Sequence, residues 1–300
     1  MQSFSRGWSF LQQAWSTAFK DKDLLKPSIY SLIVGSIVSV IGAIPIIIAA
    51  IFIGDSGTVG QIVIGVMGVI LVFVQYVVTY VFSAMTVYLI YGYLAEGDGR
   101  MDKAWAVVRR DFVDIITLAA ASALVATLRN IANRNRGRGG IGASIARGAT
   151  NLLSALWTEA SYLVLPAMVI DDLNLKDGMA RILKITKDNL LLIGISTVGV
   201  RWVTGLIGFV LGMIGLVLGA GLFYLVIAVL GFETVGLIVG IGLAVVVASL
   251  FFMLASVIGS YTSTAYHTCL YIWAREVEKA QVQGSSARVT APAPLAAVLS

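Results

Sequence analysis

The stretch that decides the fold class is residues 27–53, PSIYSLIVGSIVSVIGAIPIIIAAIFI, which contains no Asp, Glu, Lys or Arg. A helix that crosses the hydrocarbon core of a bilayer needs about 20 predominantly apolar residues. Five further apolar runs follow along the chain. We therefore expect an all-α polytopic membrane protein with about six transmembrane helices, near residues 28–53, 59–94, 112–128, 149–170, 190–230 and 235–273.

The composition supports this class. The chain is 58% apolar and 12% charged, with a mean hydropathy of +0.92, whereas soluble domains are about 45–50% apolar and about 25% charged. Its net charge of +5 would indicate a nucleic-acid partner in a soluble protein, but the basic residues gather at the ends of the apolar runs, as in membrane topology signals. We expect no nucleic-acid partner.

The scarcity of cysteine and histidine excludes several chemistries. Cys269 is the only cysteine and His267 the only histidine, so neither an internal disulfide nor a usual zinc site is available. A catalytic serine-histidine-acid set is not credible with one histidine near the end of the last helix. The sequence therefore predicts no enzyme, no catalytic residues, no metal and no cofactor.

The basic residues predict the orientation of the chain. Lys20, Lys22 and Lys26 precede the first membrane helix, while residues 54–58 after it carry no basic residue. The positive-inside rule then places the N-terminus in the cytoplasm, and six crossings return the C-terminus there. No small-residue cleavage site follows the first run, so we interpret it as a retained anchor.

One segment conflicts with the positive-inside rule. If all six helices cross the membrane, five arginines lie outside: Arg129, Arg134, Arg136, Arg138 and Arg147. The apolar run of the third expected helix, residues 115–128, is only about 21 Å long, whereas the bilayer core is about 30 Å thick. This helix and the next one, residues 149–170, form either a re-entrant hairpin or two crossings with an external loop. We favour two crossings, with the third helix starting at Phe112. The loop is expected to attract phosphate headgroups of anionic lipids or another subunit; a solvated loop is the alternative.

An amphipathic segment precedes each odd-numbered membrane helix, near residues 3–22, 100–112 and 174–188. Their apolar stripes at helical spacing predict helices that lie in the membrane interface. The first stripe holds Phe4, Trp8, Leu11, Trp15 and Phe19, and the second Met101, Ala104, Trp105, Val108 and Phe112. Asn174 and Asp177 predict a capped start for the third segment.

A basic-acidic pair closes each segment, namely Lys20-Asp21, Arg110-Asp111 and Lys187-Asp188. This recurrence predicts three parallel units, each an interfacial helix plus a helical hairpin. The alternative is that any cytoplasmic helix entry carries such a pair. Residues 1–280 would then form one helical membrane domain, and residues 281–300, which have linker composition, a C-terminal tail.

Five glycines form one stripe along the expected membrane helix 190–230: Gly205, Gly208, Gly212, Gly215 and Gly219. Small residues at this spacing let another helix approach closely. The stripe is interpreted as a subunit interface or as a moving contact along a conduction path, with packing inside one chain as the alternative.

Two ionisable residues are expected deep in the membrane. Glu159 lies 12 residues before Asp171, and Arg201 lies 13 residues after Asp188, so both sit about 18–20 Å from the cytoplasmic face. Intramembrane charges mark functional sites by default. We expect a Glu159–Arg201 ion pair, acting as a structural clamp or as a gate or anion site. His267, among nearby tyrosines, is interpreted as an aromatic-belt residue in preference to a proton relay.

Two groups of motifs carry a family resemblance. They are SRGW at 5–8 with KDKDLL at 20–25, and ALW at 155–157, YLVLP at 162–166, VIDD at 169–172 and GMA at 178–180 with Lys187. Together they resemble an uncharacterised family of prokaryotic six-helix membrane proteins, a domain of unknown function, which is distantly similar to the membrane domain of glycerophosphoryl diester phosphodiesterases. The resemblance implies a multi-pass protein of the prokaryotic plasma (inner) membrane. It implies no activity and no catalytic residues.

The functional prediction from the sequence is a homo-oligomeric pore or permeation pathway in contact with membrane lipids and without catalytic activity. The alternative is a membrane scaffold that transports nothing and uses its interfacial helices and cationic loop to bind anionic lipids or partner proteins. Bulk ion flux in liposomes discriminates the two.

Overall fold

The computed structural model describes residues 2–53, 57–134, 141–283 and 289–299, and the side chains of 5–53, 57–133, 148–185, 200–280, 283 and 289–296. Throughout these ranges the regular structure is helical, with no strand. The helices are α1 (Gln2–Lys20), η1 (Lys22–Leu24, a 3-10 turn), α2 (Lys26–Ile53), α3 (Thr58–Glu96), α4 (Met101–Arg110), α5 (Phe112–Arg134), α6 (Ile141–Asp171), α7 (Leu175–Leu230), α8 (Thr234–Val282) and α9 (Ala293–Leu299).

Six of these helices are long and apolar enough to cross a membrane, which confirms the predicted fold class. The spans are Lys22–Ile53, Thr58–Glu96, Phe112–Asn133, Gly148–Asp171, Val200–Leu230 and Thr234–Ala280. Large apolar side chains cover their outer faces; Phe52, for example, is 79% exposed and Val229 is 81% exposed. Apolar surface this continuous would aggregate in water, whereas lipid solvates it.

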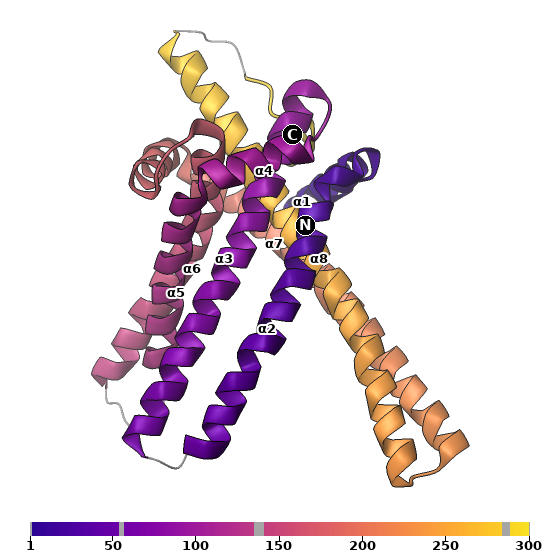
Figure 1. Cartoon of the computed structure of the whole chain (residues 1–300). Coiled ribbons are helices and arrows are strands. Elements are labelled where there is room, and N and C mark those ends of the chain that lie inside the picture. Colours follow the sequence, from indigo (N-terminus) through magenta and orange to yellow (C-terminus); the bar gives the residue numbers. More distant parts are fainter. Residues whose placement is uncertain (1, 54–56, 135–140, 284–288, 300) are drawn as a thin grey trace.

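The membrane helices form three hairpins, α2–α3, α5–α6 and α7–α8, and the helices of each hairpin pack against each other. Figure 1 shows that α2, α5 and α7 all end at the same end of the molecule. Helices α1 and α4 and the C-terminus lie toward the opposite end, and the α7–α8 hairpin diverges from the other two. Helix α3 is central, because it contacts α2, α4, α5, α6 and α8.

Helix α5 is longer than the apolar run that predicted it. It starts at Phe112, as expected, and its membrane span of 22 residues is about 33 Å long, enough for a core of about 30 Å. It also runs toward the same end as α2 and α7 (Figure 1). Both observations favour a full crossing over the re-entrant hairpin.

Two of the predicted basic-acidic pairs mark equivalent junctions. The Asp21 amide donates to the Thr17 carbonyl at 3.1 Å, and the Asp111 amide to the Val107 carbonyl at 2.9 Å. Each aspartate carbonyl then accepts from the next helical segment. The aspartate thus ends one helix and begins another, without a long linker. Asn174 caps α7 by accepting from the Asp177 amide at 2.9 Å, which confirms that start signal.

The third unit differs from its prediction. Residues 175–230 form one continuous helix, so the structure contains no separate interfacial helix over 174–188. The Lys187-Asp188 pair is followed by further helix-compatible residues and by no proline that would break the backbone hydrogen bonds. The side chains of this pair lie outside the described residues. The threefold repeat stays a prediction.

The amphipathic helix α1 packs with a face that differs from its predicted stripe. Its buried residues include Phe10, Ala14 and Ala18, while Trp8 and Phe19 are 42% and 66% exposed. In α4 the prediction holds in part, because Ala104 and Val108 of the predicted stripe are buried together with Val107, whereas Trp105 is exposed. Phe112, the last residue of that stripe, begins α5 and is exposed. Alanines allow close helix contact, and they lie on the buried faces of both α1 and α4.

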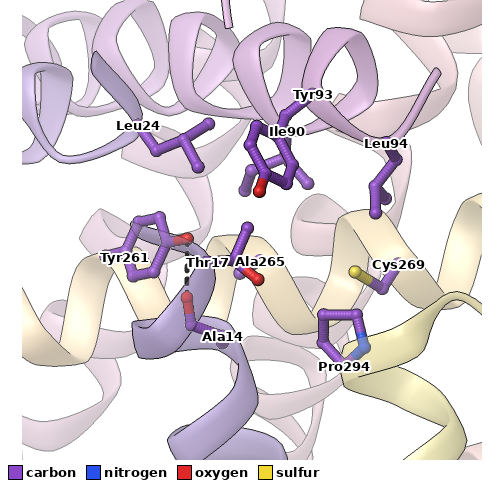
Figure 2. A pocket seen from close by; sticks show the side chains of 10 residues that line it. All are labelled: Ala14, Thr17, Leu24, Ile90, Tyr93, Leu94, Tyr261, Ala265, Cys269 and Pro294. Carbon is purple, nitrogen blue, oxygen red and sulfur yellow. Dashed lines mark hydrogen bonds between the residues drawn. The ribbon is translucent and has the colours of Figure 1, made fainter. Parts of the chain in front are cut away.

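The C-terminal segment is docked, contrary to the predicted tail. Helix α9 packs against α1 and α8, and its Leu295 is fully buried. Pro294 closes a small cavity of about 10 Å³, shown in Figure 2 beside Cys269 and Tyr261. That volume holds about one water molecule, so the cavity is not a ligand pocket. The apolar residues of the segment explain its docking, since they bury surface that a polar linker would leave exposed.

Candidate functional site

Three membrane helices bring ionisable side chains together in one place. Glu159 comes from α6, Arg201 from α7 and His267 from α8. The Arg201 Nη1 atom lies 2.5 Å from Glu159 Oε1, and His267 Nε2 lies 3.5 Å from Glu159 Oε2. We call these three residues the membrane charge cluster. The pair expected from equal calculated depth is therefore in contact, with a histidine as a third member.

The three side chains differ in exposure. The side chain of His267 is 5% exposed, that of Glu159 31% and that of Arg201 57%. Glu159 Oε1 and His267 Nε2 are buried atoms that lack a well-directed hydrogen bond among the described residues. The cluster is thus closed on the His267 side and open on the Arg201 side.

The structure corrects the interpretation of His267 as an aromatic-belt residue. Belt residues face the headgroups, but Tyr261, Tyr266 and Tyr271 are each at most 1% exposed and His267 is 4% exposed. The imidazole stacks on Tyr162 of α6, with ring centroids 4.9 Å apart, and meets Tyr266 edge-on at 5.1 Å. The sequence contains one usable signal for this position: a lone histidine within an apolar span, at a depth of about 12 Å counted back from Arg275.

Polar side chains also join the other membrane helices. The hydroxyls of Tyr80 and Ser122 lie 2.8 Å apart, and the Trp157 indole donates to Ser122 at the same distance, which links α3, α5 and α6. The Gln75 amide donates to the Gly35 carbonyl at 2.8 Å and to the Ser39 hydroxyl at 2.6 Å. The Trp157–Ser122 contact holds α6, and with it Glu159, against α5, while the Gln75 contacts join α3 to α2.

A second set of charges links α4, the C-terminal end of α6 and α8. Asp171 pairs with Arg275 at 2.9 Å and accepts a hydrogen bond from the Tyr271 hydroxyl. Arg110 pairs with Asp111 at 2.6 Å and with Asp172 at 3.1 Å. The hydrogen bond to Asp111 raises the pKa of the Arg110 guanidinium.

The adjacent carboxylates of Asp171 and Asp172 lie at the end of a membrane span, where a carboxylate pair could take part in catalysis. Both carboxylates are already neutralised by arginines. In the described part of the chain, no group of three or more His, Cys, Asp or Glu side chains has an arrangement that could hold a metal ion. Because each aspartate pairs with an arginine of another helix, we interpret this set as a structural clamp between helices.

The glycine stripe of α7 lies partly against α8 of the same chain. A Cβ atom built on Gly219 would lie 2.8 Å from the Ala244 carbonyl oxygen, one on Gly215 would lie 2.7 Å from Phe251 Cβ, and one on Gly212 would lie 3.0 Å from the Phe252 ring. Gly205 and Gly208 have no such neighbour within 4 Å. The first three therefore pack inside the hairpin, and the last two present an open surface.

The arginine loop is described only in part. Arg129 lies on α5 and is exposed. Arg134, Arg136, Arg138 and Arg147 lie outside the residues whose side chains the structure describes. The expected binding of anionic headgroups to this loop stays a prediction.

Fold and site together define a class: a polytopic α-helical membrane protein with a cluster of three ionisable groups inside its membrane spans. Comparison with protein-family models found no match to this chain, and comparison with curated proteins found no significant match. The family resemblance described above therefore stays a prediction. The membrane charge cluster holds a guanidinium, a carboxylate and an imidazole in contact, and the open side of Arg201 can bind an anion.

Proposed function

We propose that the protein is a multi-pass protein of the prokaryotic plasma membrane, with cytoplasmic termini, that assembles into a homo-oligomer and provides a permeation pathway for anions beside Arg201. The observation that carries the proposal is the exposure of this arginine. Its side chain is 57% exposed although apolar residues flank it along the helix. A guanidinium directed into hydrocarbon is costly, so the open side of Arg201 faces water or a polar group.

The surface around Arg201 supports assembly with a second copy. Gly205 and Gly208 follow Arg201 by four and seven residues, which puts all three on one face of α7. Both glycines have open space where a side chain would stand, so another helix can approach there closely. A second subunit on this face would enclose the arginine and exclude lipid from it. The proposal includes no catalytic activity.

Anion flux into liposomes that contain the purified protein tests this function. We expect protein-dependent chloride flux that falls about tenfold or more in Arg201→Gln, because the substitution removes the charge that stabilises an anion in a low-dielectric path. Arg100→Gln is the matched control, since Arg100 pairs with Asp102 at the surface. Wild-type liposomes without flux, or equal flux in both variants, would contradict the proposal. The mass of the detergent-solubilised complex tests the oligomer separately.

A non-transporting scaffold is the second candidate, favoured by the exposed rings of the amphipathic helices. Trp8 and Phe19 on α1, and Trp105 and Phe112 at α4 and its junction, are all exposed. Aromatic rings beside basic residues such as Lys20 and Arg109 are typical of helices that rest in the headgroup region. An intact oligomer without any ion flux would favour this candidate.

The orientation gives a prediction that labelling checks. Lys103 on α4 is expected to face the cytoplasm, together with both termini, because basic residues concentrate there. In right-side-out vesicles, a cysteine introduced by Lys103→Cys should react with a membrane-impermeant reagent only after permeabilisation. The natural Cys269 is 1% exposed and should contribute little background, which Cys269→Ala controls. Rapid labelling of intact vesicles would reverse the topology.

A further inference from the structure

The protein's only histidine is held in a fixed orientation inside the membrane. His267 Nδ1 lies 2.7 Å from the backbone carbonyl oxygen of Ser263, one helical turn earlier. A carbonyl oxygen can only accept a hydrogen bond, so Nδ1 carries a hydrogen and donates it. This assignment determines the state of the other ring nitrogen.

The other nitrogen, Nε2, faces Glu159 Oε2 at 3.5 Å and has no hydrogen bond among the described residues. A bare Nε2 would direct its lone pair at a carboxylate oxygen, an unfavourable arrangement in a buried site. Arg201 Nη1 lies 2.5 Å from the other oxygen of Glu159 and pairs with the carboxylate as its counter-ion. The missing proton therefore belongs on Nε2, where it turns a repulsive contact into an attractive one.

We propose that Glu159 and His267 form a binding site for one exchangeable proton inside the membrane, with the imidazolium as its occupied form. The proton comes from water that reaches the cluster along the open side of Arg201 and returns by the same route. On release, the Nε2–H bond breaks, its electron pair stays on Nε2, and His267 becomes the neutral Nδ1–H tautomer. Only a proton is exchanged, so the step needs no oxidant, reductant or other reactant.

Among the described residues, the charged groups beside His267 are Glu159 and, across its carboxylate, Arg201. Helix α6 contributes Glu159 and Tyr162, α7 contributes Arg201 across the carboxylate, and α8 itself contributes Tyr266. Helix α1 presents the uncharged Phe10 ring to Tyr266. The groups of α3 near Tyr162 are tyrosines, Tyr76 and Tyr80, and the only charged residue of α2 is Lys26, which pairs with Asp23. An imidazolium at His267 would thus share the carboxylate of Glu159 with Arg201.

Proton occupancy changes the charge of the cluster. With the proton bound, two cations and one anion leave one net positive charge; without it, the cluster is neutral. Release also removes the attraction between α6 and α8 at this point. One consequence rests on the proposed function. An anion beside Arg201 meets a cluster of net positive charge only while His267 is protonated, so anion flux should fall as the imidazolium is lost.

The single histidine makes a direct test feasible in the full-length protein. Protein labelled with ¹³C,¹⁵N-histidine and purified without a histidine tag gives one imidazole in its NMR spectrum. We expect both ring nitrogens to carry a hydrogen in the occupied site, and only Nδ1 to carry one after release. Glu159→Gln should lower the imidazolium fraction, measured at the same pH as the wild type, by about fivefold or more. Glu233→Gln, in the exposed α7–α8 connection, is the control and should change nothing.

A wild-type imidazole whose Nε2 carries no hydrogen at any pH at which the protein stays folded would overturn the proton site. An unchanged imidazolium fraction in Glu159→Gln would overturn the role of Glu159. Should that variant fail to fold, Arg201→Gln gives a second test, because it leaves the Glu159–His267 pair intact and should keep the imidazolium; its loss there would overturn the assignment. The NMR measurement does not depend on transport, so the two proposals can fail separately. An imidazolium without anion flux would overturn the proposed function alone. Anion flux with a neutral imidazole would overturn the proton site alone.

Discussion

Replacing Glu159 by alanine is expected to destabilise the protein by about 1–3 kcal/mol, because the change leaves the Arg201 guanidinium inside a membrane span without its anion. Arg201 and His267 both contact this carboxylate. Removing one partner of a fully buried pair costs about 3–5 kcal/mol. The half-exposed Arg201 side chain is screened on its open side, which lowers the expected cost. Thermal or denaturant unfolding of the purified protein in detergent measures it.

The cluster geometry predicts an asymmetry between the two single variants. Arg201→Ala should cost less than Glu159→Ala, because it leaves the carboxylate paired with His267. The double variant should recover part of the Glu159→Ala loss, and a double-mutant cycle isolates that coupling. Equal costs that add independently would show that the ion pair contributes no stability. The cycle also controls for packing changes that either truncation causes.

Replacing Gly219 by leucine is expected to open the α7–α8 hairpin and to cost about 1–3 kcal/mol through overpacking. The added Cβ would lie 2.8 Å from the Ala244 carbonyl oxygen. This neighbour is a backbone atom, so it cannot rotate away as the end of a side chain can. A lower unfolding temperature and a reduced yield of cross-links between α7 and α8 would report the opening.

Other glycines provide matched controls for this prediction. Gly221→Leu introduces the same side chain two residues away, where nothing lies within 4 Å, and should leave stability nearly unchanged. Gly212→Leu should cost less than Gly219→Leu, because the Phe252 ring edge, 3.0 Å away, can rotate. Equal stability of the Gly219 and Gly221 variants would show that α7 and α8 are not in close contact at Gly219.

Several features of the fold could be predicted because they depend on local chemistry. The six spans follow from the number of apolar residues that a bilayer core requires, and the structure has six such helices. The Asn174 cap depends on residues three apart. The common depth of Glu159 and Arg201 follows from the fixed rise of a helix, so their contact could be expected from residue spacing and opposite charge alone.

The tertiary structure decided what counting along a helix cannot determine, namely which face turns inward and which helices are neighbours. His267 could be placed at a depth, but only the packing of α6 against α8 brings it to Glu159. The outward position of the Trp8 and Trp105 rings could not be predicted because aromatic rings are equally stable against lipid and against protein, so hydrophobicity alone does not choose between them. The docking of Leu295 depends on a surface built by helices distant in sequence. Periodicity and length are local properties of the chain, whereas the charge cluster exists only where three separate helices meet.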